Sequence, residues 1–155
     1  MNSYFLRDDN GKRIPNPQLK GHLCEFHEIY KYLTKFMDEM NFKEKKHYGF
    51  YKLCEDYYIT FFSDLNGGNG DKDGFFILFG EILDINALTI NEEDRIYYLD
   101  VKKFKKDNVD VYGLCSIVLS AIRDYWQNRK EIKKYKVRRF LNTCKDGSVL
   151  WSERK

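Results

Sequence analysis

The chain has 155 residues, of which 43% are hydrophobic and 17% aromatic. A chain of this length can bury a core within one domain without disulfide or metal cross-links, and its aromatic content excludes a disordered chain and favours a fold that contains a sheet. The formal net charge of +3 is too small to indicate nucleic-acid binding by itself.

The first predicted element is a small hairpin over residues 3–14, with Asn10 and Gly11 in a tight turn. Pro15 and Pro17 are expected to end its strand pairing. Residues 23–42 are predicted to form an amphipathic helix, because apolar residues recur there at spacings of three and four. Its apolar face comprises Phe26, Ile29, Tyr30, Leu33, Met37 and Met40.

Aromatic, β-prone runs follow this helix. Residues 48–54 and 57–63 are predicted to pair as an antiparallel hairpin, and residues 75–79, extending toward 83, and 95–101 are predicted to be further strands. A second, more buried helix is predicted over residues 111–128, capped by Asp107, Asn108 or Asp110. Residues 137–141 and 148–151 are predicted to form a closing hairpin around the turn at 145–147.

This order of elements predicts an α+β fold in a single domain, residues 1–155. Two main helices are expected to pack on a mostly antiparallel sheet of about five to seven strands, because neither a helix nor a sheet can cover its apolar face alone.

A stretch rich in glycine and carboxylates, 64-DLNGGNGDKDG-74, separates two of these strands. From Asn69 it matches the first half of a calcium loop, but position twelve, which must supply a bidentate carboxylate, is Gly80. We therefore predict a structural loop between two strands, with a cation site of another type and a loop that contacts a partner as the alternatives. The candidate partner-binding residues are Asp64, Asn66, Asn69, Asp71 and Asp73.

His22, Cys24 and His27 have the residue types of zinc ligands, and His47 or Cys54 would have to complete the set. Zinc sites usually show two close ligand pairs, and only one is visible here. We therefore predict that Cys24 is a core residue and that the chain binds no metal or other cofactor.

Asp84, Asp100 and Lys102 follow the order of a magnesium-dependent nuclease, in which carboxylates hold the metal and a lysine orients the attacking water. An acidic residue two positions before a lysine occurs in this chain about as often as its composition predicts. The motifs of serine hydrolases, zinc proteases and nucleotide-binding loops are missing from the sequence. The sequence thus favours a protein without enzymatic activity.

The four cysteines, Cys24, Cys54, Cys115 and Cys144, are widely spaced and include no C-x-x-C pair. The first residues are polar and charged, which predicts no signal peptide, and no apolar run approaches the ~20 residues that a membrane helix needs. We expect a cytoplasmic protein with free thiols and no membrane partner.

Basic residues gather in two segments, residues 102–106 and residues 129–139. The second segment carries seven basic residues and one acidic residue, a net charge of +6, so the rest of the chain sums to −3. Such a segment has the charge that an acidic protein partner requires, or nucleic acid with Tyr135 or Phe140 stacked on bases. The alternative is a solvated face whose cations offset the helix dipole. The basic patch comprises Lys102, Lys103, Lys105, Lys106, Arg129, Lys130, Lys133, Lys134, Lys136, Arg138 and Arg139.

These observations favour a non-enzymatic protein-binding module. By analogy of size and composition, bacterial or phage immunity proteins and inhibitors, which neutralise a partner protein, are one such class. Nucleic-acid binding through the basic-aromatic C-terminal region is the first alternative, and a magnesium-dependent nuclease is the second.

Overall fold

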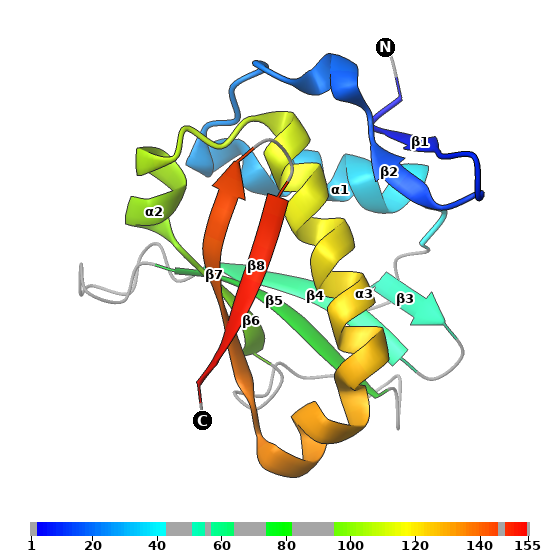
Figure 1. The fold of residues 1–155 in the computed structure, drawn as a ribbon, viewed down its shortest axis with the longest axis vertical. Helices are drawn as coiled ribbons and strands as arrows, with labels where there is room; N and C mark the ends of the chain where they lie inside the picture. The colour runs from blue at the N-terminus through cyan, green and yellow to red at the C-terminus, as the bar shows by residue number, and fades with distance from the viewer. Residues whose placement is uncertain are drawn as a thin grey trace.

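The computed structural model of the chain describes residues 3–42, 51–54, 57–63, 74–81, 95–145 and 148–154. Its elements follow one another along the chain as shown in Figure 1. They are β1 (Phe5–Arg7), β2 (Arg13–Pro15), the 3-10 helices η1 (Pro17–Leu19) and η2 (Phe26–Glu28), α1 (Ile29–Glu39), β3 (Tyr51–Cys54), β4 (Tyr57–Ser63), β5 (Gly74–Glu81), β6 (Arg95–Asp100), α2 (Val101–Lys106), α3 (Val111–Tyr135), β7 (Arg138–Lys145) and β8 (Ser148–Arg154).

The main sheet has six strands in the order β3-β4-β5-β6-β7-β8, and β1 and β2 form a separate pair. Its pairings are antiparallel except the one between β6 and β7, which is parallel. The chain reaches β7 from β6 through α2 and α3, as a parallel neighbour requires. The predicted α+β class, with a mostly antiparallel sheet and two main helices, is confirmed.

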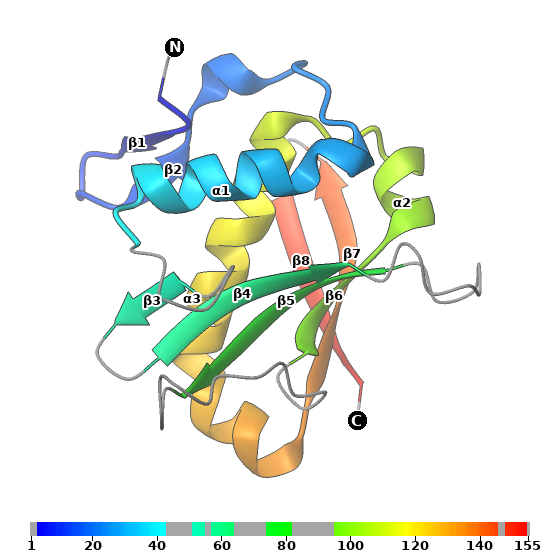
Figure 2. The same ribbon diagram turned by 180° about the vertical axis from the view of Figure 1, so that it is seen from behind.

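Alternate residues of the central strand β5 point at the helices. Phe75, Ile77 and Phe79 are buried. The ring of Phe79 stacks on Tyr125 of α3 at 4.3 Å, and the ring of Phe75 meets Tyr30 of α1 edge-on at 5.9 Å. Both helices therefore cover the same face of the sheet, α1 across its top and α3 along its length (Figure 2). Each fully buried side chain of this size contributes about 1.5–3 kcal/mol.

The opposite face of the sheet carries aromatic rings of its own. Phe76, Tyr98 and Phe140 lie on three adjacent strands, with ring centres separated by 4.9 and 5.6 Å. Farther along β5, Gly80 leaves room for the ring of Tyr58, because a Cβ atom there would lie 2.6 Å from the tyrosine hydroxyl.

The first hairpin forms as predicted but with a wider turn. Only Gly11 takes a positive φ, of 77°, and the Asp8 carboxylate accepts hydrogen bonds from the backbone N–H groups of Asn10 (2.9 Å) and Lys12 (2.8 Å). Pro15 is the last residue of β2 and pairs with Phe5, so the strand ends at the first of the two prolines, as predicted.

The predicted helix over residues 23–42 is shorter in the structure, where α1 begins at Ile29. Residues before it are held against the start of α3. The Asp110 carboxylate caps α3 by accepting from Gly113 N–H at 2.7 Å, and it also accepts from Gly21 N–H at 2.9 Å. Val111 N–H donates to the His22 carbonyl at 2.8 Å. These bonds to α3 outweigh the helical periodicity of the segment.

Helix α3 runs to Tyr135 and does not end near residue 128 as predicted. The added turns are made of strong helix formers and bury Ile132. Lys136 closes the helix in the left-handed conformation, with φ of 51°. The short helix α2 was not predicted, and the predicted strand residues 48–50 and 82–83 lie outside the described residues. Within the described ranges, no helix combines the length and apolarity of a membrane span.

Candidate functional site: a groove beside an edge strand

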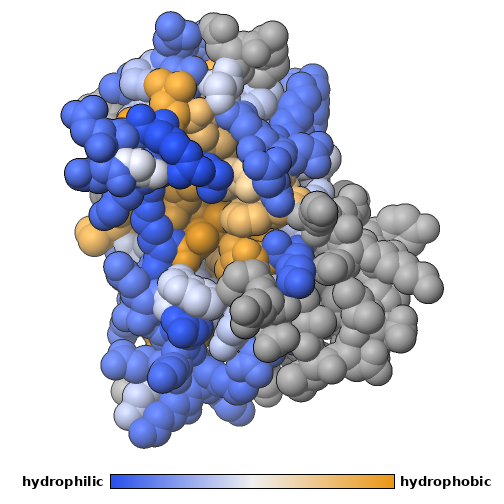
Figure 3. Space-filling model, turned by 90° about the vertical axis from the view of Figure 1, so that its right-hand side faces the viewer, coloured by the Kyte–Doolittle hydropathy of each residue, from blue (hydrophilic) through white to orange (hydrophobic). Residues whose placement is uncertain are grey.

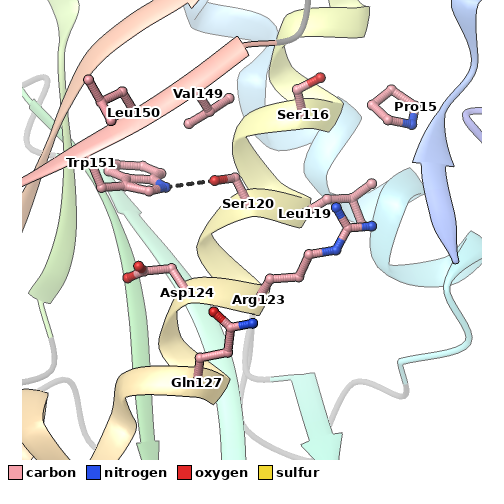
Figure 4. Close-up of a pocket in the computed structure, with 10 residues that line it drawn as sticks. All are labelled: Pro15, Ser116, Leu119, Ser120, Arg123, Asp124, Gln127, Val149, Leu150 and Trp151. Atoms are coloured by element: carbon pink, nitrogen blue, oxygen red, sulfur yellow. Dashed lines mark hydrogen bonds between the residues drawn. The ribbon is translucent and has the colours of Figure 1, made fainter.

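A pocket of about 500 Å³ opens between β8, the outer face of α3 and the end of β2. We call it the β8 groove. Helix α3 forms its floor with residues spaced three and four apart, which places them on one side of the helix. Figure 4 shows these side chains between β8 on one side and β2 on the other. The lining comprises Ser116, Leu119, Ser120, Arg123, Asp124 and Gln127 of α3, Val149, Leu150 and Trp151 of β8, and Pro15 of β2.

Strand β8 is the last strand of the sheet and pairs only with β7 among the described strands. In both ribbon views it lies beside α3 (Figures 1 and 2), and the Trp151 side chain of β8 reaches Ser120 of the helix, so α3 packs on the Trp151 face of β8, beside the open edge. Backbone N–H and C=O groups of alternate residues point to this edge. Leu150 at the groove is 59% exposed. The groove thus offers a bound segment two things: backbone donors and acceptors along the edge of β8, and a lined surface for its side chains.

A network of charged and polar side chains beneath the groove joins its β8 wall to its α3 floor. Tyr97, Arg139 and Glu153 are register partners on β6, β7 and β8. Arg139 Nε lies 2.6 Å from Asp124 Oδ2 of α3, and Arg139 Nη2 lies 3.1 Å from Glu153 Oε1. The Tyr97 hydroxyl donates to the same Asp124 oxygen at 2.6 Å. The network therefore joins three strands to the helix.

The low exposure of Arg139 and Asp124 indicates a structural role for their ion pair, whereas the side chain of Glu153 is 57% exposed. The side chain of Arg139 is 8% exposed and that of Asp124 is 20% exposed. Burial, and then the hydrogen bond to Asp124, raise the pKa of Tyr97 far above its usual range. Tyr97 consequently stays a neutral donor and is no candidate for a general base.

Trp151 forms the wall of the groove in a fixed orientation. Its indole N–H donates to the Ser120 hydroxyl at 2.9 Å, as the dashed line in Figure 4 shows. Its ring meets Tyr97 edge-on, with the ring centres 4.9 Å apart. Because Ser120 and Tyr97 both hold the Trp151 ring, the ring can contact a bound molecule without rearranging.

Arg123 lines the groove where it meets the first hairpin, and Arg7 and Arg13 lie on that hairpin without lining the groove. Arg7 and Arg13 are direct register partners in β1 and β2, and Arg13 lies on the same strand face as Pro15, two residues on. Arg123 Nη2 donates to the Arg13 carbonyl. Burial, and then the neighbouring Arg7, lower the pKa of Arg13, while Glu39 acts in the opposite direction. The Glu39 oxygens accept from the backbone N–H groups of Tyr4 and Phe5, where β1 begins.

The structure does not unite the predicted basic patch. Lys102, Lys103, Lys105 and Lys106 lie on α2, whereas the other members lie at the far end of α3 and the start of β7, at the opposite end of the molecule (Figures 1 and 2). Arg139 differs from the rest, because it is buried in the ionic network and presents no charge to solvent. The patch is thus two separate basic areas.

The second basic area is built on aromatic side chains. Arg129 lies over the ring of Trp126, 4.0 Å from its centre, and 5.9 Å from the ring centre of Tyr57. Lys133 forms an exposed salt bridge with Glu81 at 2.9 Å. Lys130, Lys134, Lys136 and Arg138 are exposed nearby along the chain. One face of Trp126 is therefore already covered by a cation.

The predicted partner loop, Asp64, Asn66, Asn69, Asp71 and Asp73, lies outside the described residues. It joins β4 and β5, which are antiparallel neighbours, so it is a connection within a hairpin as predicted.

The metal hypotheses gain no support from the described residues, among which no three His, Cys, Asp or Glu side chains are grouped to hold an ion. His22 and His27 are exposed, whereas Cys24 is buried, and burial raises the pKa of its thiol to about 12. Asp100 is exposed at the end of β6, and Asp84 lies outside the described residues.

Sequence reasoning missed the groove because its parts come from three distant segments. The small residues Ser116 and Ser120, four positions apart in the second predicted helix, were a local signal that was available. The comparisons of this chain with protein-family models, with curated proteins and with solved structures found no match. The geometry of the groove is therefore the basis of the functional proposal.

Proposed function

We propose that this chain is a protein-binding module that takes up an extended segment of a partner protein by adding it as a further strand to β8. The observation that supports this proposal is the open edge of β8 beside a preformed pocket. In strand addition, main-chain hydrogen bonds supply affinity and pockets for alternate side chains supply specificity.

The α3 side of the groove fits such a segment. A strand added to β8 would lie about 4.8 Å from it, over the outer face of α3. Ser116 and Ser120 are small enough to leave room there, while Leu119 and Trp151 offer apolar contact. Uptake of one segment in this way would suit a small inhibitor or immunity protein that sequesters its target.

The proposal is tested by selecting random linear peptides displayed on phage against the folded chain and mapping the selected peptides by amide hydrogen exchange. We expect protection of the amides on the open edge of β8. Leu150→Asp should abolish binding. Leu23→Asp, which alters another exposed leucine far along the chain from the groove, is the matched control and should not. Selected peptides that leave β8 amides unprotected would refute strand addition.

Nucleic-acid binding is the second candidate function. It is supported by Tyr135, which is 53% exposed with the Lys134 ammonium 5.3 Å from its ring centre, beside the exposed cations of α3. Titration with a single-stranded oligonucleotide at low and physiological salt tests it. Affinity that falls steeply with salt and is lost in Tyr135→Ala would support it, and affinity absent at low salt would exclude it.

A further inference from the structure

We infer that the segment bound in the β8 groove is anchored by an aromatic side chain, which enters the groove between Trp151 of β8 and Pro15 of β2, over Leu119 of α3. This inference rests on the proposed function, because it specifies the residue of the added strand that the groove recognises.

The first step of the argument is the direction in which side chains of an added strand would point. The side chain of Trp151 contacts Tyr97 and Ser120, so it lies on the face of the sheet that α3 covers. Val149 lies on the same face, because side chains alternate along a strand. A residue of the added strand directly opposite Val149 or Trp151 shares that face. Its side chain would therefore point into the groove over α3.

The second step is the room that such a side chain would find. The lining beside Trp151 is apolar or small, and it comprises Pro15, Leu119, Val149, Ser116 and Ser120. Figure 4 shows Trp151 and Pro15 on opposite sides of the space, with α3 between them. The volume of about 500 Å³ is in the range of small-molecule pockets, so an aliphatic side chain would leave much of the lining without contacts. An aromatic ring fills more of this space and can pack against the indole of Trp151.

The third step is the charge of the groove. Its lining contains one cation and one anion, Arg123 and Asp124. The Asp124 carboxylate is already held by Arg139 and by the Tyr97 hydroxyl. Arg123 donates to a backbone carbonyl of the first hairpin. The lining therefore has no net charge with which to select a charged side chain, and burying a charge without a partner is costly. An uncharged anchor is favoured.

The test uses the peptides selected on phage. The selected sequences should share an aromatic residue, and a synthetic copy with alanine in its place should bind at least about tenfold more weakly by fluorescence anisotropy. Val149→Ala should weaken the aromatic peptide at least about threefold and leave the alanine copy nearly unchanged. Leu53→Ala is the matched control, because it truncates a half-buried side chain of β3 at the other end of the sheet. Circular dichroism verifies that each variant is folded.

The outcomes separate this inference from the proposed function. Peptides that protect β8 amides and keep their affinity when the aromatic residue becomes alanine would overturn the inference and leave strand addition standing. Selection without any peptide that protects β8 would overturn both. Protection of β8 that rises with protein concentration and without peptide would mean that a second copy of the chain occupies the edge, which also overturns both.

A second apolar surface provides one more outcome. Figure 3 shows an apolar area framed by hydrophilic side chains on the side of the molecule that carries the first hairpin. Aromatic peptides that protect β1 and β2 but not β8 would bind on that side of the molecule. That result would overturn both the inferred anchor site and strand addition to β8.

Discussion

Replacing Asp124 with Asn tests whether the buried network holds the groove together. The change removes one of the two carboxylates that face Arg139, whose side chain is 8% exposed. Removing one partner of a buried ion pair costs about 3–5 kcal/mol. Because Glu153 remains within 3.1 Å of the guanidinium, we expect the lower end, about 3 kcal/mol.

Urea unfolding followed by circular dichroism measures this loss. With a typical urea dependence of about 2 kcal/mol per molar, the midpoint should fall by about 1.5 M. Glu131→Gln is the matched control, because it neutralises an exposed carboxylate on the same helix and should stay within about 0.5 kcal/mol of the parent protein. An Asp124→Asn variant as stable as this control would refute the assigned role of the network.

A combined variant separates the loss of attraction from the cost of an unpaired charge. Asp124→Leu, Arg139→Met and Tyr97→Phe together remove every buried partner at once. Replacement of a whole buried ion pair by apolar residues is often neutral, so the combined variant should be more stable than Asp124→Asn. If the combined variant is less stable than Asp124→Asn, the attraction between the charged groups contributes more to the free energy of unfolding than the cost of leaving a charge unpaired.

Three further predictions concern the fold. Asp110→Ala should lower the free energy of unfolding by about 1–2 kcal/mol, because α3 loses its cap, whereas the control Asp107→Ala should leave it unchanged. Equal melting temperatures of the two variants in thermal unfolding would contradict the capping role. Gly80→Ala should cost about 1–3 kcal/mol by colliding with the Tyr58 ring, and a Tyr58→Ala background should abolish that extra cost. Burial raises the pKa of Cys24 to about 12, so its thiol should stay protonated and should not react with iodoacetamide at about pH 8 until the chain unfolds. Alkylation of Cys24 in the folded protein, mapped by mass spectrometry, would contradict this prediction.

The sequence predicted those parts of the fold that local patterns determine. The antiparallel pairing of β3 with β4 and of β7 with β8 follows from short connections between β-prone runs. The cap at Asp110 follows from its place before an apolar run, since a carboxylate there accepts from the first helical N–H groups.

Contacts between distant segments were beyond the same reasoning. Nothing in the local pattern shows that β7 pairs in parallel with β6, yet this pairing aligns Tyr97 with Arg139. Arg139 therefore reads in the sequence as one of many surface cations, whereas in the fold it is buried against Asp124. The groove was missed for the same reason, because its walls meet only once the sheet and α3 are assembled.

The parallel junction in the sheet has a consequence for how the protein would lose its proposed activity. Within the described strands, the register of β6 with β7 spans only two residue pairs, Tyr97 with Arg139 and Tyr98 with Phe140, while β7 and β8 pair along most of their length. The terminal hairpin of β7 and β8 is thus paired internally along most of its length but joined to β6 over few residues. Units of this kind open together at a lower free energy than the whole domain. The contacts of Arg139 with Asp124 and of Trp151 with Ser120 strengthen this attachment, so a variant that weakens them, such as Asp124→Asn, should lose recognition at a lower temperature than most of its secondary structure.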